Sequence, residues 1–194
     1  MAQQHQDLSR AYTRLRLWAI LLHAGNVVPT FSTSTLDSER VTIGATSSPE
    51  TRQVLFILHT TCPYSRATLP VWERIADSLR RAVTPKIELY GISLDAADST
   101  RAYVHANRLS YPVLLFPERK LVDLYRAQLT PETVVLDARG RVLYARTGMS
   151  TISRWSSQMM RRGGARPRSN AGGLASGGVG GASIIGPPTS ARGA

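Results

Sequence analysis

Two periodicities of apolar residues alternate along residues 27–160, and they predict strands alternating with helices. Residues 54–58 are continuously apolar, as a strand covered on both faces requires. Helical spacing follows directly, at Leu69, Trp72, Ile75, Ala76 and Leu79. The elements predicted after these are a strand at 86–94, a helix at 99–108, a strand at 113–116, a short helix around Leu121, Leu124 and Tyr125, a hairpin of 133–136 and 142–144 with Gly140 in its turn, and a last short helix at Ile152, Trp155 and Met159. This order indicates an α/β fold with a central sheet and helices on both faces.

Composition limits the chemistry that the chain can carry. Its 194 residues suit one domain, and 42% of them are hydrophobic, enough for one core. Cys62 is the single cysteine, which excludes an internal disulfide and a four-cysteine metal site. We expect no metal and no organic cofactor.

The net charge of +11 invites a nucleic-acid interpretation, but its distribution argues against one. Up to and including Asp137 the chain has fifteen Lys and Arg residues and thirteen acidic residues. After Asp137 it has nine Arg residues and no acidic residue. Aromatic residues do not interleave with these arginines as a single-strand binder needs. The charge distribution therefore favours a solvated basic tail and no specific nucleic-acid partner.

The two ends differ from the middle, which predicts three regions, 1–26, 27–162 and 163–194. Residues 163–194 hold ten of the 15 glycines and should be disordered and dispensable for folding, although a shifted reading frame would also explain them. The first region has Arg10, Arg14 and Arg16 before a short apolar stretch at 17–24. It fits either a weak secretory signal or an amphipathic helix lying on the domain or on a membrane surface.

Candidate chemistry centres on Cys62, where the buried strand 54–58 runs through residues 59–61 into a helix. This order places Cys62 at or just before a helix N-terminus, and Pro63 suits the first helical turn. Unpaired N–H groups and the helix dipole there stabilise a thiolate, the nucleophilic form of cysteine. The pattern predicts a reactive thiol whose pKa lies below the ordinary value of about 8.5.

A family resemblance rests on several segments taken in order: 28–31 with 35–41, 55–65, 91–95, 129–133 and 135–142. In these segments residues 25–160 resemble thioredoxin-like proteins of the TlpA/ResA-like group, which overlaps the redoxin (AhpC/TSA-related) family. The resemblance implies a thioredoxin-like fold with an N-terminal hairpin and a cis Pro131 facing the active site. It also implies thiol-disulfide exchange with protein or small-molecule partners, in the cell envelope or periplasm rather than the cytoplasm.

The sequence departs from that family at the site itself. Ser65 replaces the second cysteine of Cys-x-x-Cys, and Phe56 replaces the buried aspartate of thioredoxins. Leu55 and His59 stand where peroxiredoxins need proline and a hydroxyl residue, so that peroxidase chemistry is disfavoured. Ser65 cannot resolve a mixed disulfide, but its hydroxyl can stabilise the Cys62 thiolate.

The remaining site candidates each have a structural alternative. His59 and Arg66 can lower the pKa of Cys62 by their charge, or they are surface side chains. Pro63, Tyr64, Thr130 and Pro131 are predicted to contact substrate, or they serve only a helix start and a turn. Three functions stay open: a monothiol oxidoreductase or isomerase, which we favour, a non-catalytic peptide-binding module, and a dimer linked through Cys62.

Overall fold

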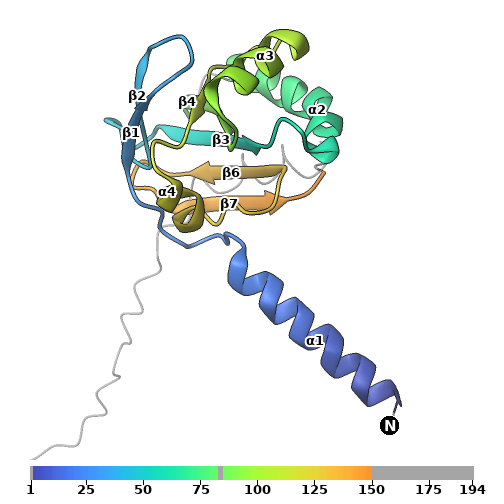
Figure 1. Cartoon of the computed structure of the whole chain (residues 1–194). Helices are drawn as coiled ribbons and strands as arrows, with labels where there is room; N and C mark the ends of the chain where they lie inside the picture. The colour runs from blue at the N-terminus through green and yellow to red at the C-terminus, as the bar shows by residue number, and fades with distance from the viewer. Residues whose placement is uncertain (1, 83–84, 150–194) are drawn as a thin grey trace, which may run out of the picture.

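The computed structural model describes residues 2–82 and 85–149. Within these residues the chain forms helices α1 (Ala2–Ile20), α2 (Pro63–Arg80), α3 (Ala97–Asn107) and α4 (Arg119–Leu124). The strands are β1 (Phe31–Ser34), β2 (Arg40–Ile43), β3 (Arg52–Leu58), β4 (Ile87–Ser93), β5 (Val113–Leu115), β6 (Glu132–Leu136) and β7 (Val142–Thr147). Strands and helices alternate from β3 to α4, and a β6–β7 hairpin closes the domain (Figure 1).

A five-stranded mixed sheet in the order β5-β4-β3-β6-β7 forms the centre of the domain. β3 pairs with β4 in parallel and with β6 antiparallel. All residues of β3 after Arg52 are buried, which explains why residues 54–58 are apolar without alternation. The C-terminal end of β3 therefore lies in the middle of the sheet edge, beside the start of β6.

Two apolar cores cover the two faces of this sheet. On one face α2 and α3 pack on alternate residues of β3, and this core includes Val54, Phe56, Leu58, Trp72 and Tyr103. On the other face α4 and the β1–β2 hairpin pack on the intervening residues of β3. This second core includes Leu55 and Ile57 from β3, together with Ile43, Leu121 and Tyr125. The predicted fold class, α/β with helices on both faces and an N-terminal hairpin, is confirmed.

The β1–β2 hairpin lies along the β5 side of the sheet. Thr35 forms an isolated bridge with Leu114, and the Leu36 N–H donates to the Val113 carbonyl at 2.8 Å. These bonds cover the outer edge of β5, a strand of three residues that would otherwise offer unpaired backbone groups.

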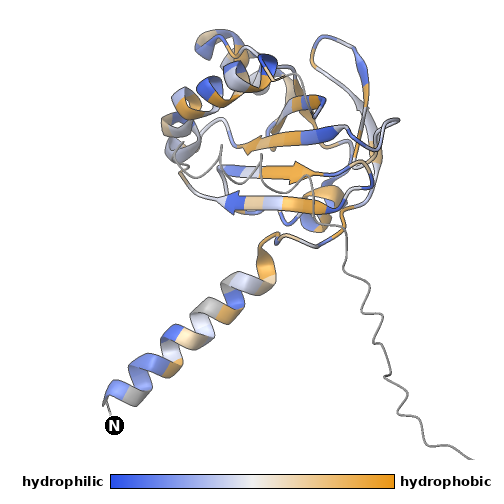
Figure 2. Ribbon diagram, turned by 180° about the vertical axis from the view of Figure 1, so that it is seen from behind, coloured by the Kyte–Doolittle hydropathy of each residue, from blue (hydrophilic) through white to orange (hydrophobic). Residues whose placement is uncertain are grey.

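Helix α1 extends away from the rest of the domain (Figures 1 and 2). The chain after it is held firmly, because Leu22 is buried in the core and the Arg126 Nη1 donates to the Leu21 carbonyl at 2.9 Å. His23 lies within the apolar stretch 17–24, and its Nε2 lies 2.6 Å from the Trp18 carbonyl at the end of the helix. Among the helices described, none is long and apolar enough to cross a bilayer.

Two sequence predictions fall outside the described residues. These are the short helix at 152–159 and the disordered tail at 163–194. The predicted hairpin around Gly140 is present, with β6 and β7 antiparallel and Gly140 at φ +72° in the turn.

Candidate active site around Cys62

Cys62 stands at the junction between the central strand and the helix that follows it. β3 ends at Leu58, and Cys62 is the N-cap residue of α2 with extended backbone angles, φ −75° and ψ 118°. Pro63 takes the first helical position, where a missing N–H leaves no bond unmade. The side chain of Cys62 is half-buried, so that its sulfur is sheltered yet accessible.

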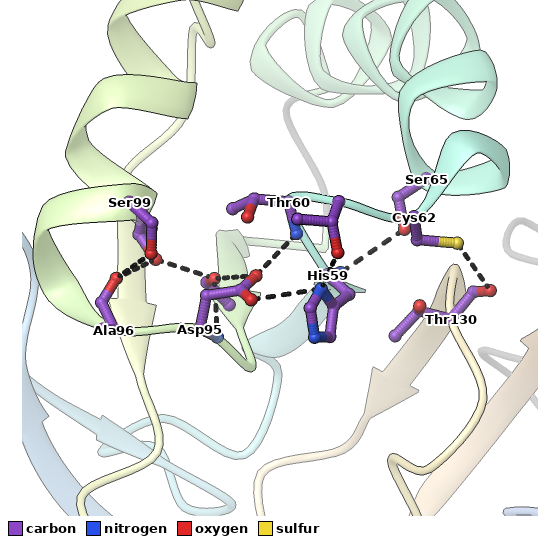
Figure 3. Close-up of polar contacts among 11 residues, drawn as sticks. His59, Thr60, Cys62, Ser65, Asp95, Ala96, Ser99 and Thr130 are labelled. Carbon is purple, nitrogen blue, oxygen red and sulfur yellow. Dashed lines mark hydrogen bonds and ion pairs between the residues drawn. The ribbon is translucent and has the colours of Figure 1, made fainter.

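The loop before β6, the strand beside β3 in the sheet, contacts the sulfur of Cys62. The Cys62 Sγ donates to the Thr130 carbonyl at 3.5 Å, and the Thr130–Pro131 peptide bond is cis (Figure 3). The antiparallel register that pairs Ile57 with Glu132 brings this loop beside the turn after β3. Thr130 and Pro131, predicted from the sequence, therefore lie together with Cys62.

Opposing influences act on the pKa of Cys62, and the net effect lowers it. Burial is the largest single influence and raises the pKa, because it disfavours the charged thiolate. Hydrogen bonds from the Ser65 backbone, the Thr130 and Ser65 side chains and the Tyr64 backbone together outweigh burial and lower it. The thiol's own bond to the Thr130 carbonyl favours the protonated form, so the lowering depends on the hydrogen bonds from Ser65, Tyr64 and the Thr130 side chain together.

Ser65 is a buried part of the site and not a surface replacement. Its side chain has no exposed area, and its Oγ accepts a hydrogen bond from the His59 N–H at 3.4 Å. The hydroxyl thus joins the two ends of the turn 59–65 and also lowers the pKa of Cys62. It stabilises a thiolate without offering a second thiol.

The structure gives His59 an acidic partner, and a charge effect of His59 and Arg66 on Cys62 stays a prediction. The causes of the lowered Cys62 pKa are burial and hydrogen bonds, and they include neither residue. His59 Nδ1 lies 3.1 Å from Asp95 Oδ1 and 2.9 Å from Thr61 Oγ1 (Figure 3). Arg66 is exposed on α2.

Asp95 organises the site and was missed by the sequence analysis. Its Oδ2 accepts the Thr60 N–H at 2.6 Å, and its Oδ1 faces His59 (Figure 3). Asp95 lies just past β4, which pairs in register with β3 so that Leu58 is opposite Ser93. The carboxylate therefore fixes the turn before Cys62 from the neighbouring strand. The only sequence signal was a polar residue after a predicted strand.

Phe56, which stands where thioredoxins have a buried aspartate, forms an aromatic pair with Trp72. Phe56 and Trp72 stack with ring centroids 4.8 Å apart and an interplanar angle of 9°. The Trp72 Nε1 donates to Thr133 Oγ1 at 2.9 Å, which satisfies the indole inside the core. The Phe56 position therefore carries packing and no proton chemistry.

Glu132, directly after Pro131, is a buried carboxyl that the sequence analysis did not single out. Its side chain is 1% exposed, and neither oxygen has a hydrogen-bond partner among the described residues. Burial raises its pKa to about 8. Near neutral pH it is therefore mostly in the neutral form.

Exposed apolar side chains occur on the chain segments that meet at Cys62. Tyr64 is 62% exposed in the turn after Cys62, and Leu129 is 41% exposed just before Thr130. Met149, 56% exposed, follows Gly148, whose N–H donates to the Pro131 carbonyl at 2.7 Å. Within residues 2–82 and 85–149 no group of three His, Cys, Asp or Glu side chains is placed to hold a metal ion.

Comparisons with known proteins agree with this geometry. The sequence profile of the AhpC/TSA family matches residues 24–145. No curated protein is found to match the chain in sequence.

Solved structures share the fold at low sequence identity. StoA from Bacillus subtilis is 18% identical with a TM-score of 0.57, over 69% of this chain and 98% of its own. A thiol-disulfide oxidoreductase from Bacteroides fragilis is 14% identical with a TM-score of 0.58, over 70% of this chain and 98% of its own. The thioredoxin domain of a thiol-disulfide oxidoreductase from Bacteroides vulgatus is 14% identical with a TM-score of 0.56, over 66% and 90%. The fold is thioredoxin-like.

Proposed function

The chain belongs to the AhpC/TSA family, and on that premise we propose that it catalyses thiol-disulfide exchange with Cys62 as its only nucleophile. The observation that carries the proposal is the lowered pKa of a half-buried thiol at the N-terminus of α2. A thiol in that environment has a larger thiolate fraction near neutral pH than an ordinary cysteine. Its substrates are disulfides of proteins or small molecules.

The exchange takes place in two balanced steps. The Cys62 thiolate attacks one sulfur of a substrate disulfide, a Cys62–substrate disulfide forms, and the other substrate sulfur leaves as a thiolate. An external thiol then attacks the mixed disulfide as its thiolate. When the external thiolate attacks the substrate sulfur, a disulfide forms between the external thiol and the substrate, and Cys62 is released as a thiolate. Cys62 is therefore neither oxidised nor reduced over the cycle.

Ser65 determines that the second step is intermolecular. A hydroxyl does not ionise near neutral pH, so it supplies no nucleophile for the mixed disulfide. Its Oγ instead contributes to the stability of the Cys62 thiolate, which makes Cys62 both a good attacking group and a good leaving group. The arrangement suits an isomerase or a monothiol exchange protein better than a reductase.

The surroundings of the sulfur favour an extended segment with apolar side chains as substrate. The Thr130–Pro131 loop lies at the sulfur, and an extended chain beside it meets backbone groups with which it can pair. Tyr64, Leu129 and Met149 offer apolar contacts on several sides. Pro63 is exposed at the start of α2 and completes this contact surface.

A two-stage trapping experiment tests the proposal. The protein is mixed with an aromatic disulfide that releases a coloured thiolate, and glutathione is then added to the isolated adduct. We expect one equivalent of thiolate per chain, released faster than from the same chain unfolded in urea, followed by recovery of free Cys62. Cys62→Ser should release none. Mass spectrometry follows both stages.

Three results would contradict the proposal, each in a different way. A folded protein that reacts no faster than the unfolded chain has no activated thiol. An adduct that glutathione does not resolve would exclude turnover, and continued binding of apolar peptides would then favour a non-catalytic binding module. Rapid conversion to a disulfide-linked dimer on non-reducing electrophoresis, in place of the adduct, would favour the Cys62-linked dimer.

A further inference from the structure

Helix α1 has an apolar face that the folded domain does not cover. Leu8 is 70% exposed, Tyr12 63%, Leu15 67% and Trp18 62%. Every residue of α1 whose side chain the structure describes is exposed, and the helix extends outward in both views (Figures 1 and 2). In the structure α1 therefore does not lie on its own domain.

The spacing gathers these residues on one side of the helix. At about 100° per residue, Leu8, Tyr12 and Leu15 lie within a narrow sector, and Trp18 borders it. Arg16 lies at the opposite border, with its guanidinium carbon 5.8 Å from the centre of the Tyr12 ring. Arg10 belongs to the far side. The result is an apolar stripe with a cation at its edge, the pattern of helices that lie in a membrane interface.

Charge decides which partner covers the stripe. The helix carries three arginines and one acid, Asp7, and no further acid occurs before Asp37. A second copy would bring like charges together, whereas an anionic lipid surface attracts them. Tyr12 and Trp18 are the aromatic types that concentrate at the boundary between headgroups and acyl chains.

The attachment of α1 makes the helix a defined part of the protein rather than a free end. The Trp18 and His23 rings stack with centroids 4.5 Å apart, and the His23 Nε2 bonds the Trp18 carbonyl. Leu22 is buried directly beyond. A helix lying on a membrane would therefore hold the domain close to that surface.

From these observations we propose that α1 is a membrane-surface anchor, in which Leu8, Tyr12, Leu15 and Trp18 insert into the interface of a bilayer that contains anionic lipid. The helix lies on the surface and does not span it, in keeping with its length and polarity. This proposal is independent of the chemistry of Cys62.

Vesicle binding of the full chain tests the anchor. Vesicles of phosphatidylcholine alone are compared with vesicles in which phosphatidylglycerol replaces part of it, at low and high salt. We expect binding to the anionic vesicles that weakens as salt rises, because salt screens the arginines. Cys62→Ser should bind as the wild type does.

The decisive variant removes the apolar stripe and leaves every charge in place. The double variant Leu8→Gln, Leu15→Gln places good helix formers at both positions, so α1 should still form. Its partitioning onto anionic vesicles should fall about tenfold or more, because the apolar side chains are gone. Leu124→Gln with Leu129→Gln is the matched control, since these leucines are 45% and 41% exposed elsewhere on the domain. The control should bind like the wild type, and all variants should show the same unfolding transition.

A depth measurement gives a second readout. Lipids brominated on their acyl chains should quench tryptophan emission of the wild type, and Trp18→Phe should remove that quenching. Undiminished binding of the Leu8→Gln, Leu15→Gln variant would overturn the proposal, since it would assign binding to the arginines after Asp137. The proposal would also be overturned if the wild type does not bind vesicles but forms a dimer in solution that the Leu8→Gln, Leu15→Gln variant does not form. That result would assign the stripe to a contact with a second copy of the chain.

Discussion

Replacing Ser65 with cysteine should raise multiple-turnover reduction of disulfides by about a hundredfold or more, because a neighbouring thiol acts at high effective concentration. Residues 62 and 65 lie in the first turn around the start of α2, close enough in sequence for a disulfide of ordinary geometry. Insulin reduction with dithiothreitol as electron donor measures the change. The wild type should remain slow, since its mixed disulfide waits for an external thiol.

Ser65→Ala is the control for this substitution. It removes the hydroxyl without adding a thiol, so it should leave reduction slow and raise the pKa of Cys62 by the loss of one hydrogen bond. A Ser65→Cys protein in which mass spectrometry shows the 62–65 disulfide, but whose reduction rate stays at the wild-type value, would contradict the assigned role of Ser65.

Glu132→Gln should make the protein more resistant to alkaline pH. The folded protein keeps the Glu132 proton up to about pH 8, whereas the unfolded chain loses it near the ordinary value of 4.5. The folded state therefore binds more protons between these values, and the free energy of unfolding falls as pH rises through that window. At about 1.4 kcal/mol for each pKa unit, the loss amounts to roughly 3–5 kcal/mol.

Urea denaturation of wild type and Glu132→Gln at several values between about pH 5 and pH 8 isolates this effect. The cost of burying the glutamine amide does not depend on pH, so the difference between the two proteins should change steadily in favour of the variant. Glu118→Gln, at an exposed glutamate, should follow the wild type. Parallel curves for wild type and Glu132→Gln would show that Glu132 is not held neutral.

The sequence was sufficient to predict the fold and the position of Cys62 at a helix N-terminus. Residues 54–58 have no polar position, which is typical of a strand buried on both faces, and the structure shows such a strand there. Pro63 marked the helix start, which placed Cys62 at its N-terminus. Local signals of this kind depend on neighbours in the chain, and the structure shows the predicted strands with shifts of up to three residues at their ends.

Contacts that depend on strand register could not be predicted in the same way. The bond from the Thr60 N–H to Asp95 joins residues 35 positions apart, and it exists because β3 and β4 pair with Leu58 opposite Ser93. Without that register His59 looked free to act on Cys62. Its pairing with Asp95 could not be predicted from the order of the residues alone.

The burial of Glu132 could not be predicted from the sequence for a different reason. All five residues of β6 are buried, so that strand has no polar face on which a glutamate would be expected. A charged residue in the run from Glu132 to Leu136 was the available signal, and its meaning depended on knowing that β6 lies between β3 and β7. Only the assembled sheet shows a carboxyl without a partner.

The rate of Cys62 alkylation by iodoacetamide, followed from mildly acid to alkaline pH, tests the central claim most directly. Cys62 is the single cysteine, so the signal belongs to one thiol, and the same chain in urea provides the reference. The folded midpoint should lie below the unfolded one, because the hydrogen bonds at the start of α2 outweigh burial. A folded midpoint at or above that of the unfolded chain would contradict the claim that Cys62 is an activated nucleophile.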